Sequence, residues 1–343
     1  MFKNPFTPVF GGKPESFFGR EAILTRFDAA LIDLGSEYRA LFITGSRGYG
    51  KTALLEQLSS RAKKAGWFTV DVGPENPIAS IMRNLDRYNE ATRTIEPEIE
   101  LNVLGSGGKL SGGSVSKTAH YSRDDFEFMF LQACERRADR LFVSIDEAQK
   151  VALDDMSAIS NVFQMASRKG HDVILVIAGL PYAYEKIIQH EGCTFMRRGA
   201  HENLGPFTRQ EVEAGFCKLL GSIKGLTVAD GAMEELVSFS KGHPYVMQLE
   251  GYYLIESING RSAGRRYEVG LDDVKSIEPL VVTAYQRRAL DPLLADLPAA
   301  QVNFLRVMAG LLDGDRIANT GDIAAKLGKK PNEASRMRKQ LLD

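Results

Sequence analysis

An eight-residue run between two apolar segments constrains this chain more than any other feature. The run is Gly45-Ser46-Arg47-Gly48-Tyr49-Gly50-Lys51-Thr52. A continuously apolar stretch at residues 40–44 precedes it, and a helical pattern beginning at Ala53 follows it. The glycines let the backbone curl so that successive amides point at phosphates, and a helix start adds partial positive charge. The run therefore predicts a nucleotide-binding loop, with Lys51 on the outer phosphates and Thr52 on Mg²⁺.

Further short apolar runs at residues 67–72, 141–145 and 173–177 alternate with amphipathic helical patterns. Strands that are this uniformly apolar belong to a parallel sheet covered by helices on both faces, so we expect an α/β fold. Residues 95–119 interrupt this succession of strands and helices. They hold a stretch in which apolar and polar residues alternate, followed by a Gly/Ser-rich stretch. This segment is predicted to be either an inserted flexible hairpin or a surface loop without a role.

Two carboxylates end the strand predicted at residues 141–145. Asp146 would hold the magnesium shell, and Glu147 would polarise a water for in-line attack on the γ-phosphate. Acidic residues at strand ends are common, so the pair gains its meaning from the phosphate-binding loop. Together the two motifs predict an ATP site that binds Mg²⁺ and releases ADP.

Changes in pattern divide the chain into four parts. Residues 1–16 carry three prolines and are expected to form an extended arm, and residues 17–205 hold the strands. From residue 206 helical patterns take over, starting with Thr208 and Glu211 at capping-box spacing, and an all-α domain is predicted over 206–290. Residues 291–343 show three short helical patterns around a turn at residues 328–330, which suggests a helix-turn-helix.

These motifs resemble those of the AAA+ ATPases, a group of P-loop NTPases, and more narrowly the clade of origin-recognition initiators and STAND switch ATPases. Residues 17–21, with Gly19 and Arg20, look like the box that borders the adenine. Gly45 to Thr52 matches Walker A, and residues 145–149 match Walker B. Residues 242–245 are similar to the sensor 2 turn, which places His243 and Pro244 near the phosphates. The resemblance implies a helical lid and a C-terminal winged-helix-like domain.

The sequence departs from that family at two places. Residues 178–181, Ala-Gly-Leu-Pro, offer no polar sensor 1 side chain, and Tyr245 stands where the initiators carry an arginine. His243 is expected either to contact phosphate or to serve in packing. Arg197 and Arg198 are expected to be either an arginine finger toward a neighbouring subunit's ATP or an exposed basic turn. The losses predict slow hydrolysis and use of ATP as a conformational switch.

A local basic excess marks the C-terminal segment. Residues 321–343 hold six basic and three acidic residues in a chain whose formal net charge is −1. Residues predicted to contact double-stranded DNA are Lys329, Lys330, Ser335, Arg336 and Lys339. The alternative is a protein-binding module. The sequence stops where a winged helix would continue into its β wing, so either the wing is absent or the chain is truncated.

The expected function is an ATP-dependent switch that couples nucleotide state to homo-oligomerisation and DNA binding. One alternative is a nucleotide-binding adaptor, with little hydrolysis, that recruits a protein partner in stress or phage defence. Another is a small-molecule kinase, which Glu147 makes less fitting because it suits water activation. Three widely spaced cysteines and the lack of a signal-like start predict a cytoplasmic protein without a membrane partner.

Overall fold

The computed structural model describes residues 1–9, 17–93, 123–137, 140–262, 266–312 and 317–342. The segment predicted as an insertion, residues 95–119, lies outside them. Contacts divide the chain into two compact units, Met1–Ser276 and Ile277–Asp343. Among the described residues, no helix has the length and apolarity needed to cross a bilayer.

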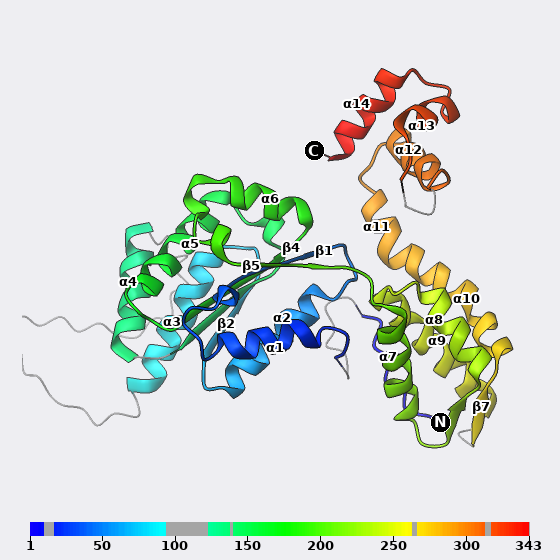
Figure 1. Ribbon diagram of the computed structural model, residues 1–343, viewed down its shortest axis with the longest axis horizontal. Coiled ribbons are helices and arrows are strands. Elements are labelled where there is room, and N and C mark those ends of the chain that lie inside the picture. The colour runs from blue at the N-terminus through cyan, green and yellow to red at the C-terminus, as the bar shows by residue number, and fades with distance from the viewer. Residues whose placement is uncertain (10–16, 94–122, 138–139, 263–265, 313–316, 343) are drawn as a thin grey trace, which may run out of the picture. The chain divides into compact units, whose positions relative to one another are not determined.

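The first unit contains a five-stranded parallel sheet in the order β2-β3-β4-β1-β5. Its strands are β1 (Ala40–Gly45), β2 (Phe68–Val72), β3 (Leu141–Ile145), β4 (Val173–Gly179) and β5 (Ala200–Leu204). The helices around it are α1 (Glu21–Ala30), α2 (Lys51–Lys64), α3 (Pro77–Arg93), α4 (Arg123–Arg137), α5 (Leu153–Arg168) and α6 (Pro181–Gln189). Figure 1 shows α1 and α2 on one face of the sheet and α3 to α6 on the other. This confirms the predicted α/β architecture.

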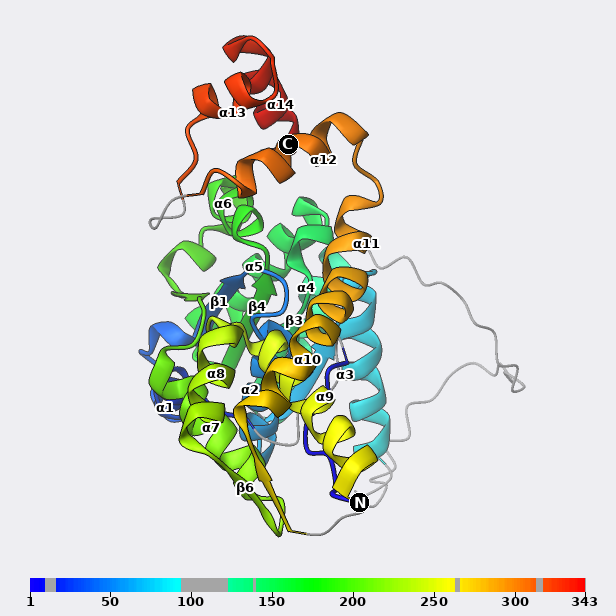
Figure 2. The same ribbon diagram turned by 90° about the vertical axis from the view of Figure 1, so that its right-hand side faces the viewer.

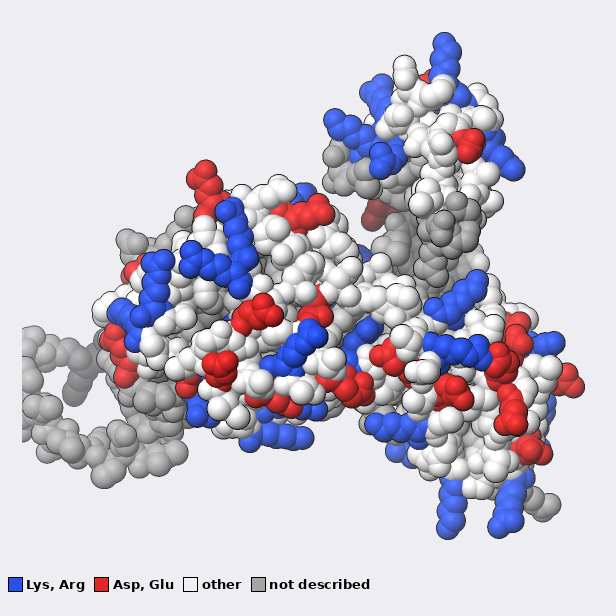
Figure 3. Space-filling model, viewed as in Figure 1, with Lys and Arg blue, Asp and Glu red and all other residues white. Residues whose placement is uncertain are grey.

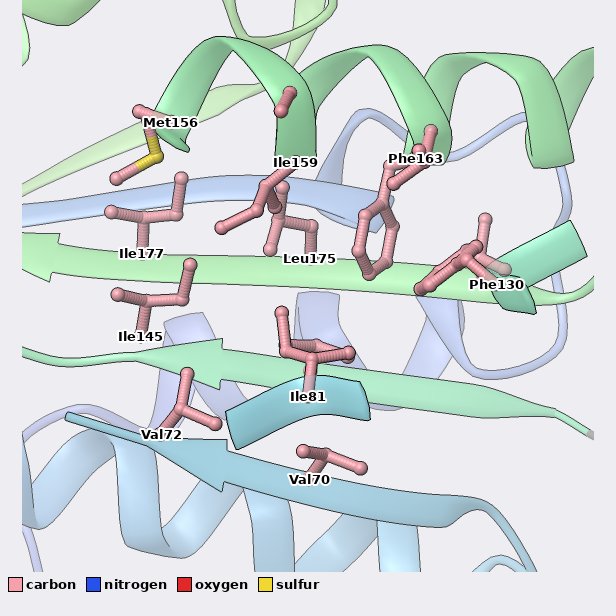
Figure 4. Close-up of a cluster of buried hydrophobic side chains, with 14 of the residues drawn as sticks. Val70, Val72, Ile81, Phe130, Ile145, Met156, Ile159, Phe163, Leu175 and Ile177 are labelled. Atoms are coloured by element: carbon pink, nitrogen blue, oxygen red, sulfur yellow. The ribbon is translucent and has the colours of Figure 1, made fainter. Parts of the chain in front are cut away.

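Alternate side chains of the buried strands feed two separate cores. Figure 4 shows one of them, in which Ile145 and Ile177 point toward Met156 and Ile159 of α5. The other core joins α1 and α2 to the opposite face, with Phe27 packed edge-on against Phe142 at 5.8 Å between ring centroids. Because both faces are covered by helices, the strands are uniformly apolar, as their sequences predict.

Helices also build the rest of the first unit: α7 (Arg209–Gly221), α8 (Asp230–Ser240) and α9 (Pro244–Ser262) (Figure 2). The predicted capping box is confirmed, since Glu211 N donates to Thr208 Oγ1 and Thr208 N donates to the Glu211 carboxylate. A short parallel pair, β6 (Leu226–Val228) with β7 (Tyr267–Val269), adds a small sheet that the helical patterns did not predict. Three-residue strands are too short to leave an alternation signal.

The N-terminal arm has no helix or strand over residues 1–9, but its aromatic side chains belong to the core of this helical domain. Phe6 is 2% exposed and lies against Gly251 and Phe216. The amide of Phe2 donates to Asn259 Oδ1 at 2.6 Å, and Asn259 Nδ2 donates back to the Phe2 carbonyl at 3.0 Å. The arm is therefore an ordered part of the domain over these residues.

Helices are the regular elements of the second unit over its described residues. It holds the end of α10 (Leu271–Tyr285), then the π-helical turn η5 (Gln286–Leu290), α11 (Asp291–Leu294), α12 (Ala299–Ala309), α13 (Thr320–Lys326) and α14 (Pro331–Leu342). Phe304, Ile323, Ala324 and Ala334 form its small core. The turn between α13 and α14 contains Gly328 at φ 64°, in the left-handed region that is common just after the end of a helix.

Candidate nucleotide-binding site

The phosphate-binding loop leaves the carboxyl end of β1, in the centre of the sheet. Its last glycine, Gly50, is left-handed (φ 85°, ψ 24°) and caps the N-terminus of α2. Parallel strands place their carboxyl ends on one edge, which is where open α/β sheets bind ligands. Because β4 lies between β1 and β3, the loop, the Asp146-Glu147 pair and the end of β4 share this edge.

Lys51 is the first residue of α2 and is 7% exposed. Its Nζ donates to the carbonyls of Gly45 at 2.7 Å and Ser46 at 3.0 Å. Burial lowers the pKa of Lys51, and the nearby carboxylates of Glu147 and Asp146 act in the opposite direction. The cation therefore lies inside the curl of the loop, next to both predicted acidic residues.

Thr52 and Asp146 meet across the site. Thr52 Oγ1 donates to Asp146 Oδ2 at 2.6 Å, while Asp146 Oδ1 accepts from the amide of Glu147 at 2.8 Å. Two hard oxygen ligands side by side suit Mg²⁺, which usually takes one or two protein ligands beside phosphate and water oxygens. No cluster of three or more His, Cys, Asp or Glu able to hold a metal occurs among the described residues. The donor set thus fits magnesium held jointly with a phosphate.

Glu147 has an unusual backbone and a fixed carboxylate. Its φ of 55° puts it in the left-handed region, which is uncommon outside glycine and often marks functional positions. Its Oε2 accepts from Gln149 Nε2 at 2.6 Å and lies 3.6 Å from Lys150 Nζ. The side chain is 37% exposed, so water reaches it.

The helical domain contacts the loop through His243 and Tyr245. The His243 and Tyr49 rings lie 4.8 Å apart at 32°, and a Cβ placed on Gly48 would come within 2.6 Å of His243 Cε1. Burial lowers the pKa of His243, so the imidazole is neutral at pH 7. Pro244, the next residue, begins α9. These contacts are packing contacts; whether His243 also binds phosphate stays a prediction.

Gly19 and Arg20 lie at the junction between β5 and α7. Arg20 Nη2 donates to the carbonyl of Gly205 at 2.6 Å, and its guanidinium lies over the Phe207 ring at 4.6 Å. A Cβ on Gly19 would meet the same ring at 2.7 Å. Phe207 was not among the residues predicted from the sequence. Its backbone N–H also donates a hydrogen bond of 2.8 Å to the carbonyl of Gly242. The predicted adenine box and the sensor 2 turn are thereby joined through one aromatic residue.

Arg197 and Arg198 lie away from this site. They form a 3-10 turn, η4 (Met196–Arg198), directly before β5, whose first residue pairs with Leu41 near the start of β1. They therefore lie at the amino-terminal edge of the sheet, opposite to the phosphate loop. Arg197 is held by the carbonyls of Ile188 and His190, while Arg198 is exposed. Neither side chain lies near the phosphate loop of the same molecule.

The remaining predicted residues lie on the phosphate loop, in α2 and in the second unit. Ser46 and Arg47 are exposed on the loop, and Ala53 follows Thr52 in α2. In α14, Ala334 is buried with Met337 and Leu341 packed beside it, so Ser335, Arg336 and Lys339 project from the opposite face. Lys329 and Lys330 are exposed in the preceding turn. Figure 3 shows Lys and Arg side chains on this part of the molecule.

Comparison with known families decides the assignment of the first domain, since residues 16–177 match the model of the AAA ATPase domain. These residues carry an AAA ATPase domain. Residues 288–343 match a family described as a domain of unknown function, DUF8462. A comparison with curated proteins finds no match.

Solved structures extend the likeness beyond the AAA ATPase domain. The ADP form of the ORC2 protein of Aeropyrum pernix matches with TM-score 0.59 and 17% identity, over 99% of this chain and 89% of that one. Cdc6p of Pyrobaculum aerophilum matches with TM-score 0.57 and 16% identity, over 97% and 88%. The A. pernix ORC1 protein, solved in complex with DNA, matches with TM-score 0.52 and 16% identity, over 96% and 84%. Over nearly its whole length, the chain has the AAA+ fold of these Cdc6 and ORC proteins.

Proposed function

We propose that this protein is a slow, Mg²⁺-dependent ATPase that uses its nucleotide state as a switch for self-association and DNA binding. The observation that carries the proposal is the 2.6 Å contact between Thr52 Oγ1 and Asp146 Oδ2, beside the buried Lys51 and the water-accessible Glu147. When bound, Mg²⁺ would neutralise charge on the β- and γ-phosphates. The AAA ATPase domain and the nucleotide-bound ORC2 structure support this assignment.

Each protein group has a separate task in the proposed reaction. The amides of the loop and the start of α2 would hold the phosphates, and Lys51 would move from its two carbonyl partners to the outer phosphates. Asp146 and Thr52 would hold the metal. Glu147 would orient water and accept its proton as the phosphorus–oxygen bond to ADP breaks. The chain would thus convert ATP and water to ADP and phosphate.

Slow turnover is expected because two stabilising groups are missing from the site. Ala178 and Gly179 end β4, Leu180 follows them, and Tyr245 occupies the place expected for a cation. Removing one stabilising donor from a transition state costs roughly 100- to 1,000-fold in rate. Arg198 could supply a cation only to a neighbouring molecule's ATP, which links turnover to self-association.

Single-turnover hydrolysis tests the chemistry. Lys51→Ala should abolish ATP binding, whereas Glu147→Gln should bind ATP and cut it only at a low residual rate. Arg198→Ala should slow turnover without weakening binding, and Arg168→Ala, on a solvent-facing helix end, serves as its control. Rates typical of motor AAA+ proteins would refute the slow switch. Unchanged turnover in Arg198→Ala would assign Arg198 to the surface.

DNA binding by α14 is the part of the proposal supported by charge and by the ORC1–DNA structure. Duplex affinity should fall linearly with salt on a logarithmic plot, and Lys329→Ala should reduce the slope by about one. Lys186→Ala, on α6 of the first unit, is the matched control. Mass-resolved oligomerisation with ATP, with and without DNA, separates the switch from an adaptor for a protein partner. Assembly indifferent to both ligands would favour the adaptor.

A further inference from the structure

The side-chain amide of Gln149 connects the segments that follow two neighbouring strands, β3 and β4, at the carboxyl edge of the sheet. Gln149 lies in the 3-10 turn η2 (Ala148–Lys150) that follows β3. Its Nε2 donates to Glu147 Oε2 at 2.6 Å, and its Oε1 accepts from the backbone N–H of Leu180 at 3.1 Å. Leu180 comes directly after β4 and caps α6. Gln149 therefore bridges a carboxylate after β3 and the backbone after β4.

The chain around this bridge is shaped for close approach. A Cβ on Gly179 would lie 3.1 Å from Ala148 Cβ and 3.3 Å from Gln149 Oε1. Such distances are tighter than ordinary carbon–carbon contacts, which fall near 3.5 to 4.0 Å. A side chain at 179 would require Ala148 or Gln149 to shift by a few tenths of an ångström. Glycine at 179 thus leaves room for the Gln149 side chain to approach the backbone of Leu180.

The bridge occupies the place where β4 offers no polar side chain. Ala178 is fully buried, Gly179 has no side chain, and Leu180 contributes its amide. Glu147 has a second partner in Lys150, but that contact is 3.6 Å long and Lys150 is 61% exposed. Ion pairs that are exposed to solvent contribute little free energy to holding two side chains together. Of these two partners of the Glu147 carboxylate, Gln149 is the one that can fix its position.

We propose that Gln149 is a positioning residue that orients the Glu147 carboxylate and ties it to the end of β4. The role rests on the proposed ATPase function. A displacement of Leu180 and α6, such as a neighbouring subunit could impose, would move Gln149 and with it the group that orients water. Misplacing a catalytic group by about 1 Å can lower a rate roughly 100-fold. The bridge would let the position of α6 control hydrolysis without a polar residue on β4.

The test is Gln149→Met, which keeps the length of the side chain and removes both hydrogen bonds. We expect kcat to fall about 10- to 100-fold while ATP affinity, measured by fluorescence titration, stays within about twofold. Gln149→Asn, shorter by one methylene, should not rescue the rate. Lys150→Met, which removes the exposed partner of the same carboxylate, is the matched control and should leave kcat within about twofold.

Two further readouts separate positioning from a merely structural role. In the Glu147→Gln background, Gln149→Met should cause no additional loss, because the carboxylate it positions is gone. Hydrogen exchange of the Leu180 amide should accelerate in Gln149→Met and stay unchanged in Lys150→Met, with or without nucleotide. A wild type without Mg-ATPase activity overturns the ATPase function and this role together. An active wild type whose kcat survives Gln149→Met, or whose loss adds to that of Glu147→Gln, overturns this role alone.

Discussion

Gly48 and Gly50 form a matched pair for testing whether the helical domain packs on the phosphate loop. Both are left-handed, at φ 82° and 85°. A Cβ on Gly50 would meet nothing within 4 Å, whereas one on Gly48 would lie 2.6 Å from His243 Cε1 and 3.2 Å from Tyr245 Cβ. Gly50→Ala therefore isolates the backbone cost, and Gly48→Ala adds a steric clash with the helical domain.

The two costs can be estimated separately. Placing alanine in the left-handed region costs about 1–2 kcal/mol. The clash on Gly48 brings carbons about 1 Å closer than their optimum, and overpacking of this kind costs about 1–3 kcal/mol. His243 cannot turn aside freely, because it is half-buried and its ring lies against Tyr49. Gly48→Ala should thus lower the free energy of unfolding by about 2–5 kcal/mol, against about 1–2 kcal/mol for Gly50→Ala.

Urea unfolding of the nucleotide-free protein measures both free energies of unfolding. The variants are compared only where their denaturant m values agree, because equal m values indicate equivalent unfolded states. The decisive variant combines Gly48→Ala with His243→Ala, which removes the ring that the new methyl group would strike. In that background only the 3.2 Å contact with Tyr245 Cβ remains, so the cost of Gly48→Ala should shrink toward that of Gly50→Ala, a coupling of about 1–3 kcal/mol. Equal costs for the two glycines, or a Gly48→Ala cost that His243→Ala leaves unchanged, would refute the contact.

Three other outcomes follow from burial. Phe6→Ala should cost about 3–5 kcal/mol in the free energy of unfolding, whereas Val9→Ala, at 65% exposed, should stay within about 0.5 kcal/mol; equal effects would detach the arm from the core. Burial lowers the pKa of His243 from 6.5, so the unfolded chain binds more protons just below that pH. Stability should therefore fall as pH drops below about 6.5 and fall less steeply in His243→Gln; parallel pH profiles of the two proteins would contradict this. A thiol reagent should label native Cys217 alone, because the other two cysteines are buried and burial raises their pKa, to about 12 for Cys134 and about 11 for Cys193. Fast labelling of more than one thiol would contradict this.

Local signals were sufficient for the parts of the site built from consecutive residues. The phosphate loop could be predicted because β1, the glycines and the start of α2 follow one another in the chain, and their geometry is dictated by nearest neighbours. The capping box at Thr208 is local in the same way. Asp146 could be paired with Thr52 because parallel strands share a carboxyl edge. Each of these predictions needed only periodicity and strand direction.

Contacts between distant segments left no such signal. Gln149 is an ordinary polar residue in sequence, and its role depends on β4 being the neighbour of β3 in the sheet. In sequence, Phe207 looks like a linker residue. In the structure it is contacted by Gly19, which lies far before it in the chain, and by Gly242, which lies after it. Phe6 lies in a proline-rich stretch that reads as an arm, and its burial depends on a niche opposite Gly251. In each case a glycine creates room for a distant side chain, which composition alone does not reveal.

Tyr245, at the position where the sequence resemblance predicts a cation, determines how the helical domain can respond to the loop. An arginine would attract phosphate over several ångströms, so its effect would grow gradually with approach. Tyr245 and His243 instead touch Gly48 and Tyr49 by packing, and packing forces vanish within about 1 Å. A loop that shifts on binding or losing nucleotide would then either fit α9 or displace it. Such a contact suits an on/off coupling between nucleotide state and domain position, and it should be insensitive to salt, unlike the charge-based binding proposed for α14.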